Sequence, residues 1–174
     1  MSNRSHFNWR QHQALFHAAR NATAATVAVL VARLIGFAET YWAAMTILIV
    51  MQSDARTTFS VSVRRLAGTA LGATFGAALA SCFGPTAVAF GAGIFLLGLF
   101  CEALSEGNDY LSEYFDRTTY RYGNVTLAVV MLIAHYNSAW IMALHRFFEA
   151  AIGIAVGLLM SIFWPEPDVD GVQS

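Results

Sequence analysis

The stretch RLAGTALGATFGAALASCFG, residues 65–84, begins with an arginine and carries Gly68, Gly72 and Gly76 at every fourth position of an apolar run. A run of about 20 mostly apolar residues is long enough to cross the hydrocarbon layer of a bilayer as a helix. Glycines four residues apart share one helix face and allow another backbone to approach closely. The stretch therefore predicts a transmembrane helix with a smooth packing face.

A second stretch, RFFEAAIGIAVGLLMSIFWP at residues 146–165, repeats this pattern at an offset of 81 residues. Both stretches begin with arginine, and Gly153 and Gly157 match Gly72 and Gly76 of the first stretch. The same offset places Tyr41 on Tyr122. Self-similarity at a fixed offset indicates an internal duplication. The alternative is chance similarity between two glycine-containing membrane helices.

Apolar segments fill most of the chain, which is 174 residues long and 57% hydrophobic. Ordinary globular domains are roughly 45–50% apolar. We therefore expect an all-α polytopic membrane protein with six transmembrane helices, at 21–37, 41–52, 65–83, 85–104, 122–136 and 138–164. The second and fifth segments are short for a full span, so four spans with two re-entrant pieces remain an alternative.

Two halves of three helices each, 21–84 and 85–165, follow from the duplication. Because three is an odd number, the second half would sit upside down in the bilayer relative to the first. Inverted repeats recur in secondary transporters, where short hydrophobic segments at corresponding positions of the halves point to the substrate site. Here those segments are the second and the fifth.

Arginine supplies every positive charge of the chain, which has a net charge of −1. Most arginines fall on the N-terminal segment or on the second and fourth connections: Arg4, Arg10, Arg20, Arg56, Arg64, Arg65, Arg117 and Arg121. The positive-inside bias then predicts that the segment 1–20 and the tail 166–174 are both cytoplasmic. The charge pattern shows no basic patch for a nucleic acid.

Arg65 and Arg146 begin the two matching helices from opposite membrane sides, so an inverted repeat places two guanidinium groups symmetrically about the midplane. Guanidinium binds carboxylate bidentately and stays charged when partly dehydrated. The pair therefore predicts an organic-anion site, with Tyr41 and Tyr122 on the adjacent short segments. The alternative for Arg65, beside Arg64, is a topology anchor. The glycine faces either serve helix packing or line a narrow path.

Glu149 lies in the sixth apolar segment on one helix face with Arg146 and His145. An ionisable residue within a membrane span is a functional hypothesis by default. One interpretation is that Glu149 and His145 form a proton-coupling site. The alternative is that Glu149 is the counter-ion that neutralises Arg146. Arg33 and Glu39 suggest a further, structural pair near the end of the first segment.

Catalytic chemistry has no support in the pattern. The five histidines and two cysteines show no metal-ligand spacing, and neither a phosphate-binding loop nor a GxSxG motif is present. We expect no enzyme activity and no cofactor.

The combination YWAAMTILIVMQ at 41–52 and RRLAGTALGATFGAALA at 64–80 resembles the fusaric acid resistance and aromatic acid exporter superfamily. The later stretches YRYGNVTLAVVMLIAH at 120–135 and HRFFEAAIGIAVGLLMSIFWP at 145–165 are similar to the closing half of the same domain. The resemblance extends from about residue 20 to 165.

The resemblance implies a six-helix membrane domain that exports aromatic or other small organic carboxylates, here across a bacterial inner membrane. The positions of the family's motifs correspond in this sequence to Arg65, Gly68, Gly72, Arg146 and Gly153. Many members have a further cytoplasmic or membrane domain, so this chain is expected to form a homo-oligomer, most simply a dimer. The alternatives are a passive anion channel and a non-transporting partner subunit or scaffold.

Overall fold

The computed structural model describes residues 3–52, 54–107, 112, 114–133 and 138–164, and within these ranges the chain forms six helices and no strand. The helices are α1 (Asn3–Ile35), α2 (Tyr41–Val50), α3 (Ala55–Phe83), α4 (Ala87–Gly107), α6 (Arg117–Ile133) and α7 (Ala139–Phe163). The predicted all-α class is confirmed. The tail 166–174 and the end of the fifth expected span, 134–136, lie outside the described residues.

Four helices are long and apolar enough to cross a membrane: Leu15–Ile35, Arg56–Phe83, Ala87–Glu106 and Ala139–Phe163. The other two are shorter. The 10 residues of α2 extend about 15 Å, and the 17 residues of α6 about 25 Å. Both fall short of a hydrocarbon layer about 30 Å thick. These are the two segments that the sequence singles out as short.

The first and third helices begin well before their apolar segments. One continuous helix, α1, includes most of the expected N-terminal segment 1–20 as well as the span that follows it. The third helix begins at Ala55, ten residues before the expected start, because Asp54 caps it. Its carboxylate accepts a hydrogen bond from the Thr57 backbone N–H at 2.8 Å. Hydrogen bonds from the side chain and backbone of Thr57 hold the pKa of Asp54 below its usual value.

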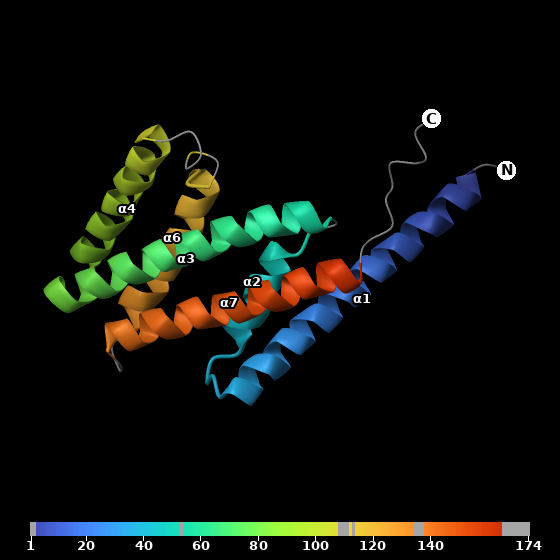
Figure 1. Ribbon diagram of the computed structural model, residues 1–174, viewed down its shortest axis with the longest axis horizontal. Coiled ribbons are helices and arrows are strands. Elements are labelled where there is room, and N and C mark those ends of the chain that lie inside the picture. The colour runs from blue at the N-terminus through green and yellow to red at the C-terminus, as the bar shows by residue number, and fades with distance from the viewer. Residues whose placement is uncertain (1–2, 53, 108–111, 113, 134–137, 165–174) are drawn as a thin grey trace.

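The two long helices α3 and α7 lie side by side and run in opposite directions through the middle of the molecule (Figure 1). On one flank α1 and α2 pack against α7, and on the other α4 and α6 pack against α3. Each short helix packs mainly on the long helix of the other half of the chain: α2 packs on α7, and α6 packs on α3. Each helix contact on one flank therefore has a counterpart on the other.

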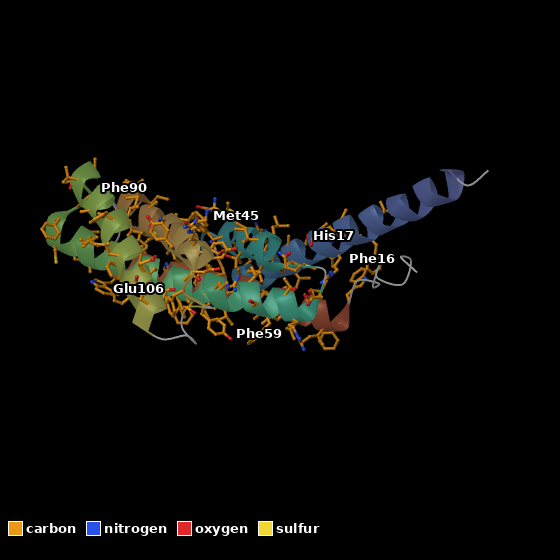
Figure 2. The ribbon with its side chains drawn as sticks, turned by 90° about the horizontal axis from the view of Figure 1, so that it is seen from above. Phe16, His17, Met45, Phe59, Phe90 and Glu106 are labelled. Atoms are coloured by element: carbon orange, nitrogen blue, oxygen red, sulfur yellow. The ribbon has the colours of Figure 1, made fainter. Side chains whose placement is uncertain are left out.

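Apolar side chains cover much of the outer surface, as expected for a protein that faces lipid. Met45 on α2 and Phe59 on α3 are exposed and lie on opposite sides of the molecule (Figure 2). Several contacts between helices instead use small residues. Ala24, Ala28 and Ala32 of α1, four residues apart, are fully buried in the core that α1 shares with α2 and α7. Small residues at helix contacts are typical of membrane proteins.

Glycines lie where the two short helices pack on α3 and α7. A Cβ added at Gly72 of α3 would lie 2.9 Å from the Gly123 Cα of α6, and closer still to the Gly123 carbonyl oxygen. A Cβ at Gly153 of α7 would lie 2.6 Å from the Ala43 carbonyl oxygen and 2.8 Å from the Thr46 Cβ, both on α2. Gly68 and Gly76 face α6 in the same way, and Gly157 faces α2 less tightly. A methyl group has no room at Gly72 or Gly153.

We predict that Gly72→Ala and Gly153→Ala each lower the thermal stability of the detergent-solubilised protein. Overpacking a tight helix contact costs on the order of 1–3 kcal/mol. The matched control is Gly91→Ala on α4, where an added Cβ meets nothing within 4 Å. That control should be neutral or gain up to about 1 kcal/mol from its better helix propensity. Equal melting temperatures for the three variants would contradict the close approach.

Candidate functional site

Arg65 and Arg146 come from the two central helices and line one small cavity. The arginines are 4% and 5% exposed. The cavity has a volume of about 20 Å³, enough for about one water molecule. Its other lining residues come from α2, α3, α6 and α7: Trp42, Thr46, Thr69, Val125, Thr126, Val129 and Ala150. The structure thus brings together the two arginines that the sequence proposes as a pair.

Arg65 is a buried cation without a carboxylate within ion-pair distance among the described residues. Its guanidinium carbon lies 4.9 Å from the centroid of the Tyr122 ring on α6. A cation over an aromatic face gains roughly 0.5–2 kcal/mol, more when desolvated. Its Nε has no hydrogen-bond partner among the residues that the structure describes. Because a buried charge is costly unless it is paired, Arg65 has the surroundings of an anion-binding group.

Arg146, by contrast, is held by two carboxylates and a ring. It forms an ion pair with Glu149, three residues on in α7, at 3.1 Å. It forms a second ion pair with Glu39, which precedes α2. Its guanidinium carbon lies 4.5 Å from the centroid of the Trp42 ring. The expected pair of Arg33 with Glu39 is therefore wrong, since the fold brings Arg146 to this carboxylate.

The two arginines share a pattern, because each guanidinium covers an aromatic ring of the short helix that packs on its own helix. Tyr122 does this for Arg65 beside the cavity, and its predicted role in substrate binding stays a prediction. Its sequence counterpart Tyr41 does not reach the cavity: it is half exposed, and its hydroxyl donates to Glu39 at 3.0 Å. The neighbouring Trp42 lines the cavity in its place.

Glu149 is 1% exposed, and its carboxylate pairs with Arg146. This arrangement is what the counter-ion interpretation requires. His145 is exposed, and its ring packs edge to face on Phe37 with centroids 5.7 Å apart. Within the described part of the chain, no ion pair joins His145 to Glu149. Proton coupling by these two residues stays a prediction.

Three buried threonines at the cavity escaped the sequence analysis. A regular spacing could have revealed them. Thr46, Thr69 and Thr126 lie four residues after Trp42, Arg65 and Tyr122, respectively. Four residues is the spacing of neighbours on one helix face. Thr69 donates its hydroxyl hydrogen to the Arg65 carbonyl at 2.7 Å, which leaves the lone pairs of its oxygen able to accept a hydrogen bond.

Arg20 was assigned only to the topology count, yet it is fully buried. Its guanidinium donates to the Gln52 carbonyl at 3.1 Å and to the Ser161 hydroxyl at 3.1 Å. Ser161 in turn donates to the Thr58 hydroxyl at 3.2 Å. This polar cluster joins α1, α3, α7 and the segment that follows α2.

A larger cavity of about 960 Å³ lies between α4 and α6. Its walls mix apolar side chains with both signs of charge, including Glu102 and Arg121. Asp116, also in the wall, pairs with Arg64 at 3.4 Å. The described walls therefore do not form a site of a single charge sign. No group of acidic, histidine or cysteine side chains in the described ranges is placed to hold a metal ion.

Residues 27–160 match the protein family described as fusaric acid resistance protein-like. The chain belongs to this family. The matched range contains every residue that lines the small cavity, and the resemblance inferred from the motifs is confirmed. No curated protein and no solved structure matched the chain. The family and the four long apolar helices together identify a membrane protein.

For this family member, we predict that Arg146 and Glu149 are energetically coupled. Arg146→Met and Glu149→Met should each destabilise the protein, because each leaves a buried charge with less compensation. The double variant should lose less than the sum of the two, by about 0.5–3 kcal/mol. Thermal unfolding in detergent measures the stability of the wild type, the two single variants and the double variant, which together form a double-mutant cycle. Additive losses would show that the pair contributes no coupling energy.

Proposed function

We propose that this protein is a membrane transporter that exports aromatic or other small organic carboxylate anions. The observation that carries the proposal is the small cavity with two buried guanidinium groups, of which Arg65 has no carboxylate partner among the described residues. Membership in a family described by resistance to an organic acid supports the same conclusion. Transport is favoured over catalysis because the site offers charge and shape but no nucleophile and general-base pair.

The chemistry of the cavity suits a carboxylate. A guanidinium presents a planar fork of donors that matches the two oxygens of a carboxylate. Thr69 and Thr126 each donate to a backbone carbonyl of their own helix, so their hydroxyl oxygens can accept a hydrogen bond from a substrate hydroxyl group. The rings of Trp42 and Tyr122 flank the arginines and would pack on an aromatic acid. The proposed substrate residues are Arg65, Arg146, Glu149 and Tyr122, with Thr46, Thr69, Thr126 and Trp42 added, and Tyr41 lies outside the cavity.

An inverted repeat is part of the proposal. The offset of 81 residues pairs α3 with α7, and the packing supports this pairing because the helix contacts of the two flanks correspond. Gly72 and Gly153 are matched by the offset, and both receive a short helix from the other half. A repeat of this kind places the substrate site near the membrane midplane, between the halves. The two arginines lie at that position in the proposed arrangement.

The observed cavity is too small for an aromatic acid, which is far larger than one water molecule. The described state is therefore closed, and transport requires the short helices to shift on the central pair. We propose that this happens in a homodimer in a bacterial inner membrane, with both chain ends cytoplasmic. The arginine distribution supports that orientation.

A second candidate is a non-transporting partner subunit. The tight closure of the cavity favours it, because a subunit with only a structural task would be packed shut. A passive anion channel is the third outcome of the test. All three differ in flux, so one assay separates them.

We predict that proteoliposomes with the wild-type protein release 4-hydroxybenzoate and that Arg65→Gln lowers the initial rate at least about tenfold. The loss of a charge-assisted hydrogen bond costs roughly 1.5–3 kcal/mol. Arg65→Gln is preferred because it leaves no carboxylate of the described residues without its ion-pair partner. Arg146→Lys keeps a charge for Glu149 and should also reduce the rate, because lysine lacks the fork.

The matched control is Arg33→Gln, an exposed arginine in the last turn of α1. Its flux should equal that of the wild type. Flux that depends on Arg65 and follows an imposed proton gradient establishes a coupled exporter, and flux that ignores the gradient establishes a channel. The absence of flux for several anions, with folded protein, would overturn the transport proposal and favour the partner subunit.

A further inference from the structure

Glu39 lies in the short connection between α1 and α2, and one of its carboxylate oxygens is surrounded by donors. The Tyr41 hydroxyl donates to this oxygen at 3.0 Å and the Trp42 indole N–H at 3.1 Å. Arg146, which is 107 positions further along the chain, donates to the same oxygen. A guanidinium, an indole N–H and a phenol hydroxyl together form a carboxylate-binding site.

We propose that Glu39 is a tethered carboxylate that occupies this site in the closed state, and that the carboxylate of the transported anion displaces it. The inference rests on the proposed function and names the device that controls access to Arg146. The exchange replaces one carboxylate by another on the same donors. No additional charge is then buried without a partner, which keeps the cost of exchange low.

The burial of the two carboxylates on Arg146 determines which one can leave. The Glu149 side chain is 2% exposed and is fixed on the same helix as Arg146. The Glu39 side chain is 32% exposed and lies outside the helices. Glu39 can therefore regain water when it is displaced, whereas Glu149 would stay desolvated. Glu149 also keeps Arg146 neutralised during the exchange.

The second half of the chain has no equivalent of this carboxylate. The offset of 81 residues that relates Arg65 to Arg146 places Tyr120 opposite Glu39. The Tyr120 hydroxyl donates to the Ile94 carbonyl at 3.4 Å on the neighbouring α4. Arg65 is therefore not covered by a tethered acid, and the proposed lock acts on Arg146 alone.

The test is the affinity of the purified protein for benzoate, measured by isothermal titration calorimetry in detergent. Removing the tethered competitor in Glu39→Gln should tighten benzoate binding about tenfold or more, because a hydrogen bond to a charged group contributes roughly 1.5–3 kcal/mol. Glu39→Ala provides a second variant should one of the two fail to fold. Benzamide, which has the same ring without the charge, should gain nothing from either change.

The matched control is Glu106→Gln, an exposed glutamate on α4 that Figure 2 shows far from Met45 of α2. This control should bind benzoate as the wild type does. Adding Arg146→Lys to Glu39→Gln should remove most of the gain, which would locate the bound anion at Arg146. Unchanged or weaker benzoate binding in both folded Glu39 variants would overturn the proposal.

The two proposals fail differently. If the wild type transports 4-hydroxybenzoate but the Glu39 variants bind benzoate no more tightly, the transporter stands and the tethered competitor is overturned. If the Glu39 variants bind benzoate more tightly but no variant shows flux, the carboxylate exchange at Arg146 is supported and the transport function is overturned.

Discussion

The close approach of backbones at Gly72 and Gly153 is the constraint on which the rest of the molecule depends. Because no methyl group separates the backbones, α6 packs closely on α3 and α2 packs closely on α7. Each short helix thereby places an aromatic ring against an arginine of the long helix on which it packs. The rings in turn make it possible to keep two guanidinium groups inside an apolar assembly. Without this close packing of α2 and α6, the cavity would lose the wall residues that the two short helices supply.

Charge is distributed unevenly over two positions that otherwise look alike. Arg146 has two carboxylates, one fixed and one on a connection, whereas Arg65 has only a ring. An inverted repeat predicts equal surroundings for its two halves, so the departures from symmetry are informative. Here the departure is the acidic pair, Glu39 and Glu149, because their sequence counterparts are Tyr120 and Gly68. In the proposed repeat, the two arginines and their rings are the symmetric part, and the two acidic residues give Arg65 and Arg146 different surroundings.

The sequence predicted the helical class, the short second and fifth helices and the two central arginines, because apolar length and glycine spacing are local properties of the chain. It failed where a partner is chosen over long range. Glu39 lies close in sequence to Arg33, and nothing local reveals that the fold brings Arg146 to it. Trp42 replaced Tyr41 because one residue turns a helix by about 100°, which the alignment of two tyrosines ignores. The start of α1 was missed because its first residues show no apolar periodicity.

The shortness of α2 has an electrical consequence. A helix about 15 Å long covers only about half of a hydrocarbon layer about 30 Å thick, so water that reached its ends would thin the insulating layer beside it. The membrane voltage would then fall over a thinner layer beside α2 than elsewhere, which strengthens the local field. Moving one elementary charge through the whole potential is worth about 2.3 kcal/mol per 100 mV. In the proposed transporter, an anion that leaves along α2 would gain part of that energy close to Arg146, whose guanidinium lies over the Trp42 ring of α2.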